Sequence, residues 1–399
     1  MMKNQRPHIG IFGKRNVGKS SFINAITGQD ISIVSGHPGT TTDPVDKIIE
    51  LEDVGPVVLI DTAGIDDAGA LGEKRIEATR KIIKKIDLGI ILFEKNDYGK
   101  FEEEIIEEFK KHQTPFFIIH NKSDLKTINS DAKKEIEKSS GTQVLDFSST
   151  KKTNLKQIMD AIKKHTPESA FQNISLLDGL VEKGDIVLMI TPLDSEAPRG
   201  RMILPEGQTL IDVLNKDCIA ITVKETEVEL YFQKIKVKPR LVVTDSQAFK
   251  KVAAVVPKDI PLTSFSILFS RLKGDFKQYI EGVKQIDKLK DGDNILILES
   301  CSHHVTHDDI GRVKIPKWLK EYTGKNLNFE VVAGTDNIPQ NKKYALAVQC
   351  GGCMLTQKQV LNRIKTASDS GVPVTNYGML IAYVNGIFER AIKPFHSGK

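Results

Sequence analysis

Two groups of residues near opposite ends of the chain have the types and spacing that bind phosphate and metal. Residues 13–20 read GKRNVGKS, which matches the glycine-rich loop that holds nucleotide phosphates. Residues 301–303 read CSH, and residues 349–353 read QCGGC. Cysteine thiolates are ligands for zinc and for iron–sulfur clusters. The pairing predicts a protein in which a nucleotide state controls work done with a metal.

The glycine-rich loop stands in the context that phosphate binding requires. Residues 8–12 form an apolar run that predicts a buried strand, and a helical apolar period runs from Lys19 to Gly28. Backbone N–H groups of the loop and the helix N-terminus can then surround the phosphates. We expect Lys19 to reach the β- and γ-phosphates and Ser20 to bind Mg²⁺. The loop residues expected at the nucleotide are Gly13, Asn16, Val17, Gly18, Lys19, Ser20 and Ser21.

Two motifs that follow have the residues to bind Mg²⁺ and the γ-phosphate. Residues 39–43 read GTTTD, and a threonine of such a loop, Thr41, is expected to bind Mg²⁺. Residues 61–64 read DTAG directly after an apolar run. Asp61 is therefore expected at Mg²⁺, and the Gly64 amide at the γ-phosphate. The candidate catalytic residues are Lys19, Thr41 and Gly64.

A further motif has the residues to recognise the base of the nucleotide. Residues 121–124 read NKSD after the apolar run 116–119. Its aspartate can accept hydrogen bonds from N1–H and N2–H₂ of guanine, and adenine lacks this pair of donors. GTP is therefore expected rather than ATP. Residues 148–150, which read SST after the run 144–147, form a weaker fifth motif. The expected contacts of these two motifs are Asn121, Lys122, Asp124, Ser148 and Ser149.

Ile65 and Asn16 indicate which GTPases the first third of the chain resembles. Ile65 follows the DTAG motif, where Ras-like proteins hold a glutamine that aligns water. These details resemble the branch that contains Era and MnmE, and they imply slow intrinsic hydrolysis. Asn16 stands where potassium-activated members place an asparagine that binds the cation, so the resemblance implies a K⁺ site there. The alternative is that Asn16 is a loop residue that tolerates an unusual backbone angle.

The last third of the chain predicts a parallel sheet that gathers the cysteines. Apolar strand-like runs at 294–298, 327–332, 344–348 and 372–376 alternate with helical segments. Both cysteine groups directly follow such runs, and ligands of parallel sheets bind beyond the carboxyl ends of the strands. From spacing alone, a zinc site and an iron–sulfur cluster are equally open, and unbound thiols are the third alternative. The fourth cysteine, Cys218, is expected to be a small buried residue.

The middle of the chain predicts a small α/β unit without catalytic residues. Strand-like runs lie at 185–190, 218–223, 229–232 and 241–244, and helical stretches lie at 207–215 and 246–254. Such a module is often an assembly surface. The expected domains are residues 1–166 for GTP binding, 175–262 for assembly and 263–399 for the metal.

Composition sets the class of protein. A chain of 399 residues needs more than one core. A net charge of +5 and 6% aromatic residues do not indicate a nucleic-acid surface. No apolar run reaches the roughly 18 residues of a membrane span, and residues 1–6 lack the apolar stretch of a signal peptide. With only four cysteines, we expect a cytoplasmic protein with reduced thiols and no membrane partner.

The order of these motifs resembles the HydF family, the GTPases that mature [FeFe]-hydrogenase, over the whole chain. The resemblance implies an α/β protein with a P-loop GTPase domain, a dimerisation domain and a parallel-sheet domain. It implies a [4Fe–4S] cluster held by Cys301, Cys350 and Cys353, with an exchangeable fourth position. It also implies a homodimer that binds GTP or GDP with Mg²⁺. Such a homodimer assembles or carries a diiron precursor made with the radical-SAM maturases HydE and HydG, and delivers it to the hydrogenase HydA.

One position departs from the family's pattern. Many members have histidine before the C-x-x-C motif, and this chain has Gln349, a poor iron ligand. His303 is therefore the candidate fourth ligand, beside a carboxylate, solvent or an exogenous group. The alternative function is an RNA- or ribosome-acting GTPase with a structural zinc site.

Overall fold

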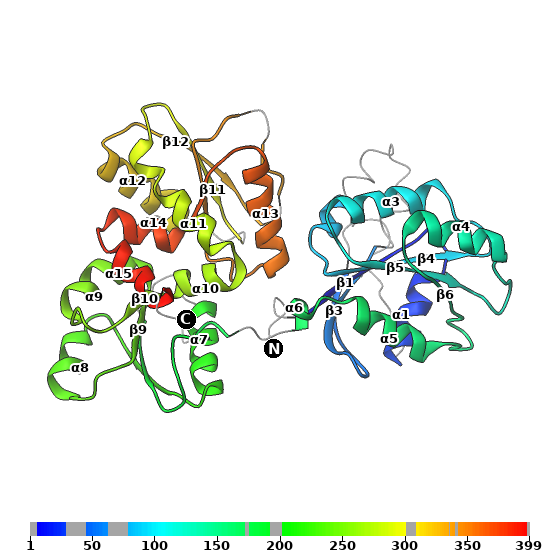
Figure 1. The fold of residues 1–399 in the computed structure, drawn as a ribbon, viewed down its shortest axis with the longest axis horizontal. Coiled ribbons are helices and arrows are strands. Elements are labelled where there is room, and N and C mark those ends of the chain that lie inside the picture. The colour runs from blue at the N-terminus through cyan, green and yellow to red at the C-terminus, as the bar shows by residue number, and fades with distance from the viewer. Residues whose placement is uncertain are drawn as a thin grey trace. The chain divides into compact units, whose positions relative to one another are not determined.

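The computed structural model describes residues 6–28, 45–62, 79–171, 175–191, 202–300, 309–334, 336–339 and 342–396. The chain forms two compact units, Met1–Asn173 and Ile174–Lys399. Figure 1 shows both units and labels many of their elements. No helix among the described residues combines the length and the apolar character that a membrane-spanning segment needs.

The first unit is built on a six-stranded sheet with the order β2-β3-β1-β4-β5-β6. All neighbouring strands are parallel except β2 and β3, which are antiparallel. The central strands are almost fully buried, as expected for a sheet with helices on both faces. The strands are β1 (His8–Phe12), β2 (Val45–Leu51), β3 (Gly55–Asp61), β4 (Leu88–Glu94), β5 (Phe116–Asn121) and β6 (Val144–Asp146).

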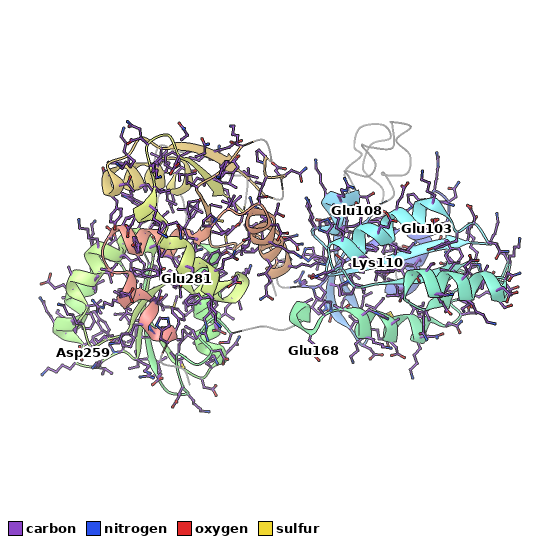
Figure 2. All side chains as sticks on the ribbon, turned by 45° about the horizontal axis from the view of Figure 1, so that its top comes forward. Glu103, Glu108, Lys110, Glu168, Asp259 and Glu281 are labelled. Carbon is purple, nitrogen blue, oxygen red and sulfur yellow. The ribbon has the colours of Figure 1, made fainter. Side chains whose placement is uncertain are left out.

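Helices cover both faces of this sheet. Helices α1 (Lys19–Thr27) and α5 (Leu155–His165) pack in one apolar core, and α3 (Lys100–Lys111) and α4 (Ser130–Ser140) pack in the other. Helix α3 buries Ile105, Ile106 and Phe109. Its residues Glu103 and Lys110, which Figure 2 labels, are exposed. This layered arrangement confirms the predicted α/β fold of the GTPase domain.

The second unit begins with a four-stranded sheet of order β10-β9-β7-β8, in which all neighbours are parallel. The run 229–232, predicted as a strand, is instead part of helix α8 (Val228–Lys234). Val228 and Tyr231 are the buried residues of α8, and their spacing of three residues is that of a helix face. The elements are β7 (Ile186–Ile190), α7 (Leu204–Asn215), β8 (Ile219–Val223), β9 (Leu241–Thr244), α9 (Phe249–Val255) and β10 (Leu262–Ser264).

The same unit continues into a second four-stranded sheet, of order β12-β11-β13-β14. All its neighbours are parallel, which confirms the prediction for the last third of the chain. The strands are β11 (Asn294–Leu298), β12 (Asn328–Val332), β13 (Leu346–Gln349) and β14 (Val374–Asn376). The helices are α10 (Phe265–Lys273), α11 (Phe276–Val283), α12 (Ile315–Thr323), α13 (Gln357–Asp369), α14 (Tyr377–Val384) and α15 (Phe388–Ile392).

One apolar core joins residues of both sheets of the second unit. It includes Leu188 and Val242 from the first sheet and Ile295 and Val348 from the second. Residue 262, where the sequence places a domain boundary, is the first residue of β10. The division into domains at 175–262 and 263–399 stays a prediction.

Helix α11 lies against β14 at a glycine. A Cβ on Gly282 would stand 2.0 Å from the carbonyl oxygen of Val374, which is far inside van der Waals contact. The hydroxyl of Thr375 also donates to the carbonyl of Tyr279 at 3.0 Å, so helix and strand are joined by a hydrogen bond near this contact. Only glycine permits so close an approach of the two backbones.

Substitution of two helical glycines should therefore have opposite effects. We expect Gly282→Ala to lower the free energy of unfolding by about 2 kcal/mol or more, because backbone must move to admit the methyl group. Gly207→Ala is the matched control: it lies in α7, and no described atom stands within 4 Å of the place that its methyl group would take. It should stabilise the protein by roughly 0.5–1 kcal/mol. Urea unfolding of both variants tests the packing, and an equal effect of the two substitutions would contradict it.

Candidate functional site

The phosphate loop between β1 and α1 depends on two glycines. Gly13 has φ +150° and Gly18 has φ +96°, values that favour glycine. A Cβ on Gly13 would lie 2.4 Å from the carbonyl oxygen of Leu92, and one on Gly18 would lie 2.5 Å from Nδ2 of Asn121. Backbone of β4 and a side chain at the end of β5 thus press directly on the loop. Larger residues at these two positions would push the loop away from both neighbours.

Lys19 lies inside this loop. Its side chain is buried, and its ammonium donates to the carbonyl oxygens of Gly13 at 2.5 Å and Lys14 at 3.0 Å. These are main-chain atoms of the loop that the sequence assigns to phosphate binding. The first turn of α1 begins at Lys19, so the ammonium, the loop and the helix N-terminus share one location. This combination provides the positive charge and the N–H donors that a polyphosphate needs.

Asn121 ties three of the predicted motifs together. Its Nδ2 donates to the carbonyl of Val17 at 2.9 Å, and its Oδ1 accepts from the Ser149 hydroxyl at 3.0 Å. Lys122 donates to the carbonyl of Asn16 at 2.7 Å. The phosphate loop and the two base-reading segments are therefore one hydrogen-bonded assembly. The backbone of Asn16 is left-handed, with φ 62°.

Glu94, at the end of β4, is a member of this assembly that the sequence reasoning missed. It forms an ion pair with Lys122. Burial opposes ionisation of Glu94, but the hydrogen bond and charge of Lys122 hold the pKa of its carboxyl below the usual value. Its signal in the sequence is a lone acidic residue that closes the apolar run 88–94. Glu94 fixes Lys122 over the loop.

The predicted base reader, Asp124, is held ionised. A hydrogen bond from the Ser148 side chain lowers the pKa of its carboxyl. An ionised carboxylate accepts only, which suits the two neighbouring donors of guanine. Ser148 itself is fully buried in the turn after β6, so its position is set by the sheet.

Asp61 lies at the end of β3, beside the phosphate loop. It is buried and pairs with Ile11 of β1 in the parallel register. The hydroxyl of the next residue, Thr62, donates to the carbonyl of Ile11 at 2.7 Å. The two strands therefore deliver the carboxylate and the loop to the same edge of the sheet. Thr41 and Gly64, the other predicted catalytic residues, lie outside the described residues.

The second candidate site lies at the carboxyl edge of the last sheet. Cys350 follows β13, and its backbone N–H donates to the carbonyl of Leu298, the last residue of β11, at 3.0 Å. Its sulfur lies 2.7 Å from the hydroxyl of Ser300. Ser300 directly precedes Cys301, which lies with His303 outside the described residues. The adjacent strand ends therefore bring the chain of Cys350 next to the segment that leads to Cys301.

Gln349 supports this edge of the sheet through hydrogen bonds to Ser300 and Cys350. It is fully buried, and its Nε2 donates to the Ser300 hydroxyl at 3.3 Å and to the carbonyl of Cys350 at 3.2 Å. The same nitrogen lies 3.6 Å from the Cys350 sulfur. The side chain thus presents a donor to the sulfur, as a residue that supports a ligand does.

Two buried cations hold the cysteine-bearing segments, and neither was predicted. Lys273 donates to carbonyl oxygens of the loop that contains Cys353. Burial lowers the pKa of Lys273 to about 8, although the charges of Cys353 and Cys350 act to raise it. Arg363 donates to the carbonyls of Glu299 at 2.6 Å and Val332 at 2.8 Å. Nothing in the sequence pattern distinguishes either cation from surface lysines and arginines.

Metal ligands are only partly described. Within the described ranges, no group of three or more histidine, cysteine or acidic side chains could hold a metal ion. Cys350 and Cys353 are half-buried thiols. Cys218 is buried, as predicted, and its thiol lies 3.0 Å from the carbonyl of Glu182 in another part of the unit. Among the described residues, the candidate metal ligands are therefore the thiols of Cys350 and Cys353.

Three family models match consecutive parts of the chain. A model described as 50S ribosome-binding GTPase matches residues 8–122. The hydrogen maturase F dimerization domain matches residues 176–274, and the hydrogen maturase F tetramerization domain matches residues 277–394. The two maturase models together cover more than half of the chain.

Curated relatives are similar mainly in the first unit. The tRNA modification GTPase MnmE of Caldicellulosiruptor saccharolyticus is 35% identical over 42% of this chain, a match that covers 35% of that relative. The GTPase Era of the same organism is 26% identical over 70% of this chain and 95% of its own length. A solved structure of an Era variant from Aquifex aeolicus bound to GDP and AlF₄⁻ is 20% identical, covers 64% of this chain and 98% of its own, and has a TM-score of 0.35.

The two maturase matches follow the GTPase match in chain order. They fall on the two parallel sheets of the second unit, and the GTPase match falls on the phosphate loop and the strands around it. The maturase models describe domains of dimerisation and of tetramerisation, so the chain carries oligomerisation domains. The chain therefore belongs to the hydrogen maturase F family, the GTPases of hydrogenase maturation, and its GTPase domain is of the Era and MnmE type.

Proposed function

We propose that this GTPase is a scaffold or carrier for the diiron precursor of the [FeFe]-hydrogenase active site. In this proposal it holds a [4Fe–4S] cluster at Cys301, Cys350 and Cys353, and an exchangeable fourth position takes the precursor. The observation that carries the proposal is the contact of Cys350 with Leu298 and Ser300. That contact brings the loop of two cysteines to the segment that leads to the third.

The residues of this loop fit an iron–sulfur cluster. Two half-buried thiols flank Gly351 and Gly352, and a buried ammonium lies beneath the loop. Soft thiolates are the ligands that such clusters use, and glycines relieve crowding around them. When bound, the cluster would supply an iron atom to which an exogenous group can attach. His303 is the candidate fourth protein ligand, and Gln349 is placed to support the site by donating a hydrogen bond.

GTP hydrolysis would act as a switch in this proposal and would not supply the assembly chemistry. Lys19 and the loop amides would bind the phosphates, and Ser20, Thr41 and Asp61 would bind Mg²⁺. Gly64 would contact the γ-phosphate, and Asn16 would bind K⁺. Ile65 cannot orient water by hydrogen bonding, so hydrolysis should be slow. K⁺ bound at Asn16 should stimulate it. The nucleotide state would then change domain contacts or partner release.

The partners follow from the proposed role. A homodimer assembled through residues 175–262 would receive precursor made with the radical-SAM maturases HydE and HydG. It would deliver the precursor to the hydrogenase HydA in the cytoplasm. Residues 1–166 would form the switch and residues 263–399 the cluster domain. An RNA- or ribosome-acting GTPase is the alternative, and the matches of residues 176–394 to maturase models favour the scaffold.

The base preference should depend on Asp124. Asp124→Asn replaces an acceptor with a group that also donates, so the pair of donors on guanine loses its partner. We expect the affinity for GTP to fall by at least about tenfold, since hydrogen bonds to a charged group are stronger than those between neutral groups. Xanthine presents an acceptor at that place, so the affinity for XTP should rise. Competition binding with GTP and XTP measures both, and an unchanged ratio of the two affinities would refute the assignment.

Cys353 should be required for the cluster. After anaerobic reconstitution with iron and sulfide, the wild type is expected to bind about four irons per chain, and reduction should give an S = 1/2 EPR signal. Cys353→Ala should bind less iron and give an altered signal. Cys218→Ala is the matched control, because that thiol is buried and lies against the carbonyl of Glu182 at 3.0 Å.

Two outcomes would count against the cluster. One tightly held zinc in the wild type, with no iron signal, would favour the RNA-acting alternative. Equal iron loss in the Cys218→Ala and Cys353→Ala variants would mean that iron binds without a specific site. Circular dichroism of each variant shows whether the fold is kept.

A further inference from the structure

Lys273 is a buried lysine that none of the roles above requires. It is the last residue of α10, and it is only 5% exposed. Its ammonium donates to three carbonyl oxygens of one loop: Leu355 at 2.7 Å, Gly352 at 3.0 Å and Cys353 at 3.4 Å. Burying a charged group without such partners is strongly unfavourable. The convergence of three carbonyls on one cation is therefore a specific feature of this loop.

The loop has no regular secondary structure to hold its shape. It runs from Cys350 to the start of α13, with no strand or helix of its own among these described residues. Gly352 is left-handed, with φ +72°, and a Cβ there would lie 2.9 Å from Val360. Within the loop, the backbone N–H of Leu355 donates to the carbonyl of Gly352 at 3.1 Å. Lys273 thus supplies the donors that regular structure would otherwise supply.

The positive charge of Lys273 also lies close to the cysteines that would hold a negatively charged cluster. As thiolates, Cys353 and Cys350 would both favour the charged form of the ammonium. The ammonium lies 5.6 Å from the centre of the Phe269 ring, a further favourable contact for a cation. A three-thiolate cluster is an anion, and its charge becomes more negative on reduction. A fixed buried cation favours the reduced form, because little solvent screens the interaction.

We propose that Lys273 is a positioning residue of the cluster site: it fixes the Cys350–Cys353 loop for metal binding, and its charge stabilises the reduced cluster. The inference rests on the proposed function for the cluster itself. Lys273 belongs to the segment that matches the dimerisation model, and the loop belongs to the segment that matches the tetramerisation model. The segment that matches the dimerisation model thus extends to a residue that holds the cysteine loop.

The first test uses the metal-free full-length chain. Lys273→Met keeps an unbranched apolar stem and removes the three hydrogen bonds. We expect the amides of residues 351–356 to exchange with deuterium about tenfold faster or more, since the lost bonds are buried. Arg271→Met is the matched control on the same helix, because Arg271 is exposed and donates instead to the carbonyl of Asp178. Unchanged exchange of the loop in Lys273→Met would overturn the positioning role.

The second test uses reconstituted protein and measures the cluster. We expect Lys273→Met to lose iron to a chelator about tenfold faster than the wild type. The midpoint potential of its cluster should be more negative, whereas Arg271→Met should match the wild type in both. An unchanged potential and an unchanged rate of iron loss would overturn the inference.

The two failures can be separated. If the wild type takes up no cluster, the proposed function fails, and the exchange experiment still decides whether Lys273 holds the loop. If the Lys273→Met variant does not fold, Lys273→Gln replaces it, because that side chain keeps a donor and removes the charge. A potential in Lys273→Gln equal to that of the wild type would then overturn the electrostatic part of the proposal.

Discussion

Parallel strand pairing is the constraint on which both candidate sites depend. Strands that run in one direction end at one edge, so loops that are distant in sequence meet there. In the first unit this brings the phosphate loop after β1 next to Asp61 at the end of β3. In the second it brings Cys350, after β13, next to Ser300, after β11. The apolar cores hold the strands in register, and the chemistry is placed in the connections.

The connections need support from outside because glycine makes them adaptable. Both candidate loops use a side chain from another element to hold backbone carbonyls. Asn121 donates to the carbonyl of Val17 in the phosphate loop, and Lys273 donates to three carbonyls of the cysteine loop. In each case the supporting group is buried, so water cannot replace its hydrogen-bond partners. Leaving these hydrogen bonds unmade would therefore be costly. A rigid loop binds its ligand without a further loss of conformational entropy.

The sequence was most informative where chemistry and periodicity agree. The apolar runs 241–244 and 294–298 coincide with β9 and β11, and the phosphate-loop motif lies between a strand and a helix as predicted. The run 229–232 was assigned wrongly, because four residues do not distinguish a strand from one helix face. Strand β10, at 262–264, is too short to give a pattern.

The supporting residues could not be predicted for a different reason. Lys273, Arg363 and Glu94 are charged side chains whose surroundings depend on contacts between segments far apart in the chain. The sequence marks Glu94 as the acidic end of an apolar run, but it gives no signal for the contact partners of any of the three. Charged residues are usually exposed, so composition favours the wrong answer for the two buried cations.

The role proposed for the carboxyl edge of the last sheet requires an iron–sulfur cluster there and not another metal. Mössbauer spectroscopy of the full-length chain, reconstituted anaerobically with ⁵⁷Fe and sulfide, distinguishes the two. We expect the quadrupole doublets of a diamagnetic [4Fe–4S]²⁺ cluster for most of the bound iron. Spectra of mononuclear iron alone, in protein that remains folded, would contradict the proposed role.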